Sequence, residues 1–473
     1  MRKNNINIFI ITLIILISFV NLGYANSGPT YWKGHPSLEI LSIKENSPIV
    51  VENEDLIFDF SKDEYLERGA YSISGIVTAT YKMSNQTNDN QTVQMAFPMI
   101  SSLREFNSED ISIKVDNKTI PFDIYIGDEV RNIRKDNQEE DKLNFKQIVK
   151  SINKEVYLPL NYDLNEVGTL YTYDVSTTSE DDVNFVIEYI SNSEKTKIIS
   201  KGFNGYRVDN NEARITAWIS DKETLEIYVI GEDIELNISG FLDGELSKKT
   251  NNYSYKVKKE NLSIEDYLKK SIIDYKDSER YNDYLTDNQL VNLFSKELDE
   301  IFGHNVSYFW IDDFYSLDYE DRIFVFVYET SFPKESIMDV SVSYIARGTM
   351  DKTSTYDPLY TFEYLLNPAE NWADFNNLNI EIKPPKAHPY IVDSSIDLNK
   401  NDKGNYVGKF ESLPDKDLSF TLYSKERITY IDKVKRKMDN LSYTFPFIIA
   451  TGIPLLIALV KKTFRVLATK KEI

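Results

Sequence analysis

Short runs in which apolar and polar residues alternate recur along most of this chain. The run from Tyr71 to Met83 has apolar side chains at most alternate positions, and the run from Val93 to Phe97 repeats the pattern after an Asn-rich turn. Such period-two alternation is typical of strands with one buried face. Comparable runs occupy residues 111–115, 120–126, 183–189, 225–229, 234–238, 323–327, 340–344, 378–382 and 420–422. This succession of short strands and turns favours β-sandwiches over βαβ units.

One segment, residues 263–303, has helical spacing instead. Apolar residues recur there every three or four positions in two stretches: Ile264, Tyr267, Leu268, Ile272 and Tyr275, then Leu290, Leu293, Phe294, Leu298 and Ile301. Thr286 and Gln289 have the spacing of a capping box, and Gly303 predicts the end of the second helix. We therefore predict a helical pair that connects two β-rich domains and buries its apolar face, in preference to a partner-binding face.

An apolar segment near the start of the chain predicts export. Residues 8–20 are apolar, follow Arg2 and Lys3, and precede the small-residue site that ends at Ala25. A basic region, an apolar region and a small-residue site in this order are the three parts of a secretory signal peptide. We expect residues 1–25 to be removed and the following residues to leave the cytoplasm.

A second apolar segment predicts a membrane anchor. Residues 441–460 carry no charge and are followed directly by Lys461 and Lys462. A helix of this length spans about 30 Å, the thickness of the hydrocarbon layer of a bilayer. Basic residues flank both ends almost evenly, so the signal peptide, and not the loop charge, sets the predicted orientation. We expect a single-pass protein of the cell membrane with an extracellular ectodomain.

The predicted fold class is mainly β, with two β-sandwich-like extracellular domains joined by a helical segment and one C-terminal transmembrane helix. In chain order, the predicted parts are a signal peptide (1–25), an N-terminal β-rich domain (26–262), a helical connector (263–303), a second β-rich domain (304–426), a juxtamembrane stalk (427–440), a transmembrane helix (441–460) and a cytoplasmic tail (461–473).

Composition narrows the function. The chain has 75 acidic and 54 basic residues and a formal net charge of -21, which disfavours nucleic acid as a partner because the surface repels phosphate. It has no cysteine, so thiol catalysis, Cys-ligated zinc and disulfides are excluded. An exported, cysteine-free chain rich in Lys, Asn and Ile indicates a bacterial surface protein, in particular one of a Gram-positive organism.

The tract from Tyr71 to Ile126 contains "MSNQTNDNQTVQMAFP" followed by "REFNSEDISIKVDNKTI". It resembles VIT-type β-sandwiches and a group of uncharacterised exported proteins of low-GC Gram-positive bacteria. The stretches "YTFEYLLNPAENWADFNNLNIEI" and "SLPDKDLSFTLY" also resemble the bacterial group. The Asp-x-Ser-x-Ser strand end of an accompanying von Willebrand A domain is not evident. The resemblance implies a fold and a location, and it carries no catalytic residue over.

Candidate catalytic groups are few. The three histidines, His35, His304 and His388, are far apart, and none has the spacing of a metal or triad motif. Asp312 and Asp313 stand among aromatic residues, as a carboxylate pair of a glycosidase would. If the segment is a strand, however, adjacent side chains point to opposite faces, and the pair cannot share one site.

One segment has part of a calcium-loop pattern. Asp397, Asn399 and Asn401 have the D-x-N-x-N spacing of oxygen ligands. The sixth position is Asp402 where glycine is needed, and the twelfth is Gly408 where a bidentate glutamate belongs. We therefore favour a polar hairpin over a calcium site here, with calcium as the only cofactor worth testing.

Aromatic residues supply the remaining candidate ligand-binding positions. Tyr31 and Trp32 lie in "PTYWKGHP" and Trp372 lies in "PAENWADF", two polar surroundings in which exposed rings would stack on sugars or anchor a protein partner. Strand-rich proteins also place many tyrosines in their cores, and we favour that use for most of the 32 Tyr and 25 Phe.

These observations favour a non-catalytic binding or interaction module at the cell surface, or an accessory subunit of an envelope complex. The expected partners are the membrane, through the C-terminal helix, and an envelope protein or polymer. A carboxylate-based envelope glycosidase and a sensor ectodomain that signals through a partner remain as alternatives.

Overall fold

The computed structural model describes residues 29–44, 46–62, 71–130, 148–149, 152, 155–190, 192–277, 284–366 and 372–437. The chain forms two compact units, each built from separate stretches of sequence. Unit 1 comprises the described residues of Met1–Val93, Ile111–Ile120 and Ser331–Ile473, and unit 2 comprises those of Gln94–Asp110 and Pro121–Thr330. Both units are mainly β, as the alternation predicts.

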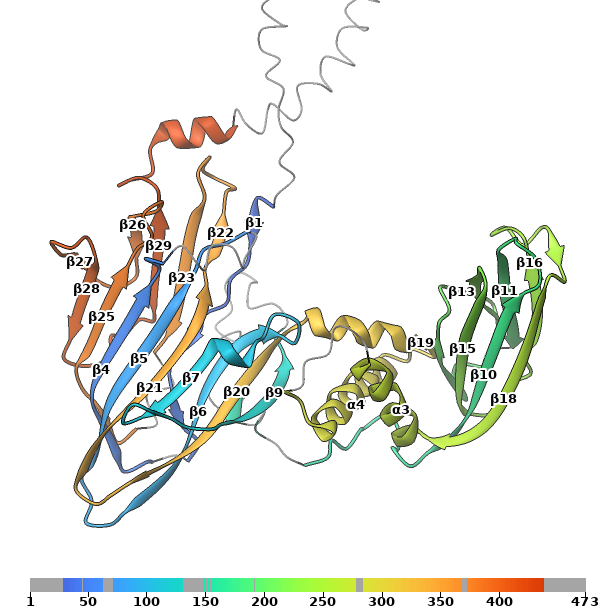
Figure 1. Cartoon of the computed structure of the whole chain (residues 1–473), viewed down its shortest axis with the longest axis horizontal. Coiled ribbons are helices and arrows are strands. Elements are labelled where there is room, and N and C mark those ends of the chain that lie inside the picture. The colour runs from blue at the N-terminus through green and yellow to red at the C-terminus, as the bar shows by residue number, and fades with distance from the viewer. Residues whose placement is uncertain are drawn as a thin grey trace, which may run out of the picture. The chain divides into compact units, whose positions relative to one another are not determined.

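The larger sheet of unit 1 has nine strands (Figure 1). Its order is β27 (Asn399–Lys400), β28 (Tyr406–Phe410), β25 (Leu378–Lys383), β4 (Ile49–Asp59), β5 (Ser74–Asn85), β21 (Ser336–Arg347), β7 (Ile111–Val115) and β8 (Lys118–Thr119), and β24 (Asp374–Phe375) also pairs with β4. The long central strands β4, β5 and β21 have the alternating burial that their sequences predict, with Val77, Ala79 and Tyr81 of β5 facing the core.

A second sheet of unit 1 covers the first. It consists of β1 (Tyr31–Trp32), β22 (Thr349–Asp351), β23 (Leu359–Leu365), β29 (Leu418–Tyr423) and β26 (Tyr390–Ser394), while β2 (Ser37–Leu38) pairs with β23; β3 (Leu41–Ser42) also lies in unit 1. Aromatic rings join the two sheets: the ring centroids of Phe58 and Phe420 are 5.2 Å apart, and those of Phe60 and Phe362 are 4.4 Å apart. Unit 1 is therefore a β-sandwich.

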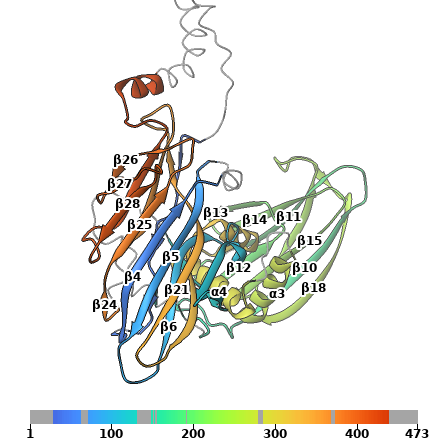
Figure 2. The same ribbon diagram turned by 60° about the vertical axis from the view of Figure 1, so that its left-hand side comes forward.

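Unit 2 contains its own sandwich of two five-stranded sheets (Figure 2). One sheet is β18 (Tyr253–Ser263), β10 (Val167–Thr177), β15 (Lys222–Gly231), β12 (Thr196–Lys201) and β19 (Tyr308–Trp310); the other is β13 (Gly205–Asp209), β14 (Glu212–Ile219), β11 (Val183–Ile190), β16 (Asn237–Phe241) and β17 (Lys249–Thr250). Residues from both sheets, among them Phe185, Ile215 and Ile227, form one buried core. The opposite face of the β13-β14-β11-β16-β17 sheet carries exposed side chains such as Trp218, whereas Tyr228 on the opposite face of the other sheet is buried and stacks on Tyr267 of the first helix, with ring centroids 4.2 Å apart.

The remaining elements, which lie wholly or mostly in unit 2, include the two predicted helices. These elements are β6 (Gln91–Ser102), the 3-10 helix η2 (Ser108–Asp110), β9 (Asp123–Glu129), α3 (Ile264–Lys276), α4 (Asp287–Gly303), the 3-10 helix η4 (Ile311–Tyr319) and β20 (Asp321–Phe332). The predicted capping box is confirmed, because Thr286 Oγ1 accepts the Gln289 backbone N–H and Gln289 Oε1 accepts the Thr286 N–H. Helix α4 ends at Gly303, as predicted, although the residue with positive φ is Asn305.

The predicted division at residues 262 and 304 does not separate two sandwiches. Strand β5 pairs with β21 over its whole length, from Asn85 opposite Ser336 to Ser74 opposite Arg347, so segments on both sides of the helices share one sheet. In the second sandwich, every strand except β19 precedes the helices in the sequence. Alternation reveals that a segment is a strand, but it carries no information about which distant strand pairs with it.

Strand pairing also differs from prediction at the 111–126 segment. The turn at Asp116 and Asn117, where both residues have positive φ, joins β7 to the two-residue strand β8. The predicted second strand instead becomes β9, which pairs with β20 in unit 2. The two strands were correctly recognised, but they lie in different units.

The predicted signal peptide (1–25), transmembrane helix (441–460) and tail (461–473) lie outside the described residues. Within the described part of the chain, no helix is long and apolar enough to cross a bilayer. Of the predicted stalk, residues 430–437 are helical, and Thr429 Oγ1 accepts the Asp432 N–H at their start.

Candidate ligand-binding face

Of the three aromatic residues that the sequence suggests as surface contacts, two are half-buried and one is buried. Tyr31 and Trp32 form the short strand β1, which pairs with Met350 and Asp351 of β22, and both side chains are half-buried. Trp372 is only 6% exposed, so its ring packs inside unit 1 and does not offer a stacking surface. The prediction of an exposed ring is wrong for Trp372. Its neighbours in the sequence are polar, but their polarity does not determine whether the ring itself is buried.

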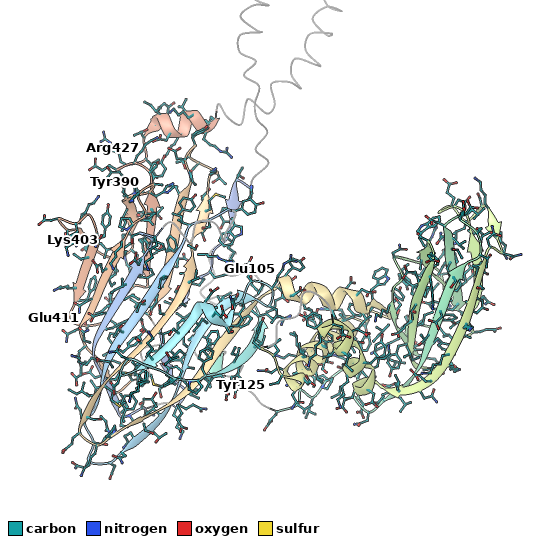
Figure 3. The ribbon with its side chains drawn as sticks, in the orientation of Figure 1. Glu105, Tyr125, Tyr390, Lys403, Glu411 and Arg427 are labelled. Atoms are coloured by element: carbon teal, nitrogen blue, oxygen red, sulfur yellow. The ribbon has the colours of Figure 1, made fainter. Side chains whose placement is uncertain are left out.

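The partial calcium pattern forms a hairpin, which was the favoured interpretation. Asn399 lies in β27, Asp397 precedes it, and Asn401 begins the turn to β28, where Lys403 lies at the tip (Figure 3). The side-chain oxygen of Asn401 accepts the backbone N–H groups of Lys403 and Asn405, each at 3.0 Å. This oxygen therefore closes a turn. Calcium binding by this segment remains a prediction.

A small acidic pocket lies in unit 2. It has a volume of about 260 Å³ and is lined by the carboxylates of Glu129, Glu297, Asp313 and Glu320 and by apolar side chains such as Phe314. Burial and the neighbouring Glu129 raise the pKa of Glu320, and burial followed by the charge of Asp312 raises the pKa of Asp313. The segment with Asp312 and Asp313 is the 3-10 helix η4, not a strand; Asp312 accepts the Gly202 N–H at 2.9 Å and does not line this pocket.

The outer face of the sheet β13-β14-β11-β16 carries a larger hollow, with a volume of about 520 Å³. Its floor includes one row of residues that face each other across four strands. Arg207 of β13 lies opposite Arg214 of β14, Arg214 lies opposite Glu188 of β11, and Glu188 lies opposite Asn237 of β16. Because side chains alternate along a strand, all four point away from the core that Ile187 and Ile215 help to form.

A second row lies two residues further along the same strands. Asp209 is paired with Glu212 across the β13–β14 turn, and Glu212 is paired with Ile190 of β11, which is 64% exposed. Asn210, in the turn between β13 and β14, has a φ of 55°. Asparagine tolerates this left-handed conformation, which allows a tight turn between the two strands. The hollow thus joins a row that contains two arginines and Glu188 to a row that contains Asp209 and Glu212.

The opposite end of this face is aromatic. Trp218 of β14 is 42% exposed and lies opposite Asn184 of β11, whose other neighbour is Phe241 of β16. Asn184 is only 3% exposed; its amide nitrogen donates to Asp243 O at 3.4 Å, and its buried side-chain oxygen has no hydrogen-bond partner among the residues that the structure describes. An exposed indole is the feature expected where a polar ligand stacks on an aromatic ring, and the unsatisfied acceptor of Asn184 lies on the neighbouring strand.

Between the two ends lies a strip of smaller side chains. Gly205 faces Thr216, and a Cβ at position 205 would lie 2.2 Å from Thr216 Oγ1, so glycine keeps this part of the face shallow. The strip connects the hollow to Trp218 on one face of one sheet. No site proposed from the sequence includes these residues. The period-two pattern in "EARITAWI" could have placed Arg214 and Trp218 on the outer face, but their cross-strand neighbours depend on pairing.

Comparisons with known proteins assign no family. The chain matches no protein-family model, and no curated protein matches it. Among solved structures, one similar chain is a Legionella pneumophila protein whose suggested role is nutrient binding; it is 13% identical, with a TM-score of 0.31 over 86% of this chain and 75% of that one. A TM-score this low supports no transfer of fold or function.

Proposed function

We propose that this protein is a non-catalytic binding module of the cell surface, and that the outer face of β13, β14, β11 and β16 holds its ligand. The single observation that carries the proposal is the presence of exposed Trp218 and the 520 Å³ hollow on one sheet face. Trp218 and Arg214 are four residues apart on β14, which separates them by about 13 Å along the strand. An extended ligand of two or more units can contact both ends.

The expected ligand is a polymer of the cell envelope. An exposed indole stacks on the apolar face of a sugar ring, and charged or amide side chains hydrogen-bond the polar groups of the next units. The sheet supplies a rigid support, because the inner faces of these strands are fixed in the core with Phe185 and Ile187, both 0% exposed. Such a face can bind with little loss of side-chain freedom.

The test is co-sedimentation of the full chain with insoluble envelope polymers. We expect Trp218→Ala to weaken binding about tenfold, equivalent to the loss of about 1.4 kcal/mol. Tyr356→Ala is the matched control, because Tyr356 is 51% exposed but lies in unit 1. Equal binding by the wild type and by Trp218→Ala would refute this face as the ligand site.

Catalysis in the acidic pocket is a second candidate function. The supporting observation is that Glu129 and Glu320 line one pocket and that the pKa of Glu320 is raised, as a general acid requires. The proposed activity is glycoside hydrolysis. Release of reducing ends from envelope polysaccharide that disappears in Glu320→Gln would support it, and no release by the wild type would exclude these substrates.

Membrane anchoring through residues 441–460 belongs to the same proposal. It follows from the hydropathy of the sequence and has its own test. External protease should remove the ectodomain of the tagged chain on intact cells, while the tag at the C-terminus stays protected. Complete protection of the ectodomain would refute the proposed orientation.

A further inference from the structure

In the hollow on the outer sheet face of unit 2, two arginines and two carboxylates lie in neighbouring rows. Along β13 and β14, like charges face each other directly: Arg207 opposes Arg214, and Asp209 opposes Glu212. Like charges directly opposite each other on neighbouring strands destabilise a sheet, whereas alternating signs would stabilise it. The arrangement of these two strands therefore has a folding cost; Glu188 of β11 lies opposite Arg214, but the two form no ion pair in the described structure.

The two rows do not neutralise each other. The diagonal neighbours Arg207 and Glu212, and likewise Arg214 and Asp209, carry opposite charges, yet none of these pairs forms an ion pair in the described structure. Neither arginine makes a hydrogen bond with any described residue. Both guanidinium groups thus keep their donors available in the hollow, in a chain with an excess of acidic residues.

The spacing of the rows defines what can satisfy both. Residues two apart on a strand are separated by about 6.6 Å, so the cationic and the anionic rows lie about that far apart. Two guanidinium groups bind a carboxylate or phosphate through charge-assisted, often bidentate hydrogen bonds. Two carboxylates at the other row attract an ammonium group. A ligand with only one charge would meet one favourable and one repulsive row.

We propose that this hollow binds a zwitterionic group, with its anion at Arg207 and Arg214 and its ammonium at Asp209 and Glu212. This inference rests on the proposed function, since it names the chemical group that the same sheet face recognises. A ligand in which an amine and a carboxylate or phosphate are separated by several bonds has this chemistry. Trp218 would contact the adjoining part of the ligand, and the zwitterionic group would fix its position and direction along the sheet.

Three small probes that differ only in charge test the proposal. The probes are 6-aminohexanoate, hexanoate and hexylammonium, titrated calorimetrically into the full chain at low ionic strength. The extended 6-aminohexanoate places its charges at about the distance between the rows. We expect it to bind about tenfold more tightly than either singly charged probe, and more weakly as salt is added. Equal affinity for hexylammonium would reduce the site to an acidic surface and overturn the proposal.

Variants assign the two ends of the site. Arg214→Gln and Glu212→Gln should each remove the preference for 6-aminohexanoate, the first by weakening the anionic contact and the second by weakening the cationic one. Lys222→Gln is the matched control, because Lys222 is exposed on the other sheet of the same sandwich. Circular dichroism confirms that each variant is folded. An unchanged preference in both folded variants would overturn the assignment.

The polymer and probe experiments separate the two proposals. If 6-aminohexanoate does not bind while polymer still binds through Trp218, the zwitterion inference fails and the proposed function stands. If 6-aminohexanoate binds with the expected variant pattern while Trp218→Ala leaves polymer binding unchanged, the inference stands and the polymer assignment fails.

Discussion

Tyr81 donates its phenolic hydrogen to Glu39 inside the sandwich of unit 1, where both side chains are at most 1% exposed. Tyr364 is next to them, with its hydroxyl oxygen 3.3 Å from that of Tyr81, and Glu54 is fully buried in the same cluster. Burial raises the pKa of Glu39 to about 8, and burial together with the charge of Glu39 raises the pKa of Glu54 well above its usual value. Neither carboxyl group has a basic partner among the described residues, so both must be neutral for unit 1 to fold well.

The first prediction is that the stability of unit 1 falls as pH rises. In the unfolded chain Glu39 loses its proton near pH 4.5, whereas in the folded chain it holds the proton to about pH 8. The folded state thus binds the extra proton within this window, so the stabilisation is complete below pH 4.5 and is lost as pH rises toward 8. Thermal unfolding followed by circular dichroism between these pH values measures the slope.

Glu39→Gln should flatten this dependence. The amide stays neutral and its oxygen can still accept the Tyr81 hydroxyl, so the variant should be more stable than the wild type at pH 8 by about 2 kcal/mol or more. Glu363→Gln, on the exposed side of β23, is the control and should leave the slope unchanged. A Glu39→Gln profile as steep as that of the wild type would show that another group is responsible.

Substitutions of Trp372 and Trp218 should separate stability from binding. Trp372→Ala removes a ring that is only 6% exposed and should lower the free energy of unfolding by about 3–5 kcal/mol. Trp218→Ala removes a ring that is 42% exposed and should cost about 1 kcal/mol or less. Urea unfolding followed by circular dichroism gives both values. A larger loss for Trp218→Ala would mean that its role is mainly structural.

Gly231 should tolerate no side chain. It has a φ of 90°, and a Cβ there would lie 2.1 Å from the backbone oxygen of Lys195 on the neighbouring β12 side of the turn. We expect Gly231→Ala to destabilise the sandwich of unit 2 by about 1–3 kcal/mol through backbone strain and this clash. Gly244→Ala is the matched control, because its Cβ would meet nothing within 4 Å. Equal melting temperatures for the two variants would contradict the described turn.

Asp299 of α4 should hold the segment 157–161 against the helix. Its carboxylate accepts the Asn161 N–H at 2.7 Å, the Leu160 N–H at 2.9 Å and the Tyr157 hydroxyl at 2.7 Å. Although burial opposes ionisation, these donors, with the Leu160 N–H first, lower the pKa of Asp299. The ionised group therefore stabilises the folded chain above the usual pKa of 3.8, and this stabilisation is lost as pH falls below it.

Asp299→Ala should release this segment and cost about 1.5–3 kcal/mol, the range for hydrogen bonds to a charged group. Limited proteolysis should then cut near Leu158 and Leu160, which are 77% and 90% exposed. Glu300→Ala, one residue further along α4, should leave the cleavage pattern unchanged. Resistance of the Asp299→Ala segment to protease would show that other contacts are sufficient to hold it.

Most local elements of the fold could be predicted from the amino-acid sequence. The alternation in β5 and β11 and the helical spacing of α3 and α4 could be predicted, because each depends on which side of a short segment faces the core. The capping box at Thr286 could be predicted because it depends on two residues that are three positions apart. The same pattern separates the inner residues of β14 from outward Arg214 and Trp218. These features follow from local geometry, so a single sequence contains them.

Which segments share a sheet, and which side chains come into contact, could not be predicted from local patterns. Pairing of β5 with β21 links residues more than two hundred positions apart, and the burial of Trp372 depends on distant strands. The opposition of Arg207 to Arg214, and of Glu39 to Glu54, likewise exists only once strands are in register. A shift of one residue would turn every side chain to the other face, so the binding face is a consequence of long-range pairing.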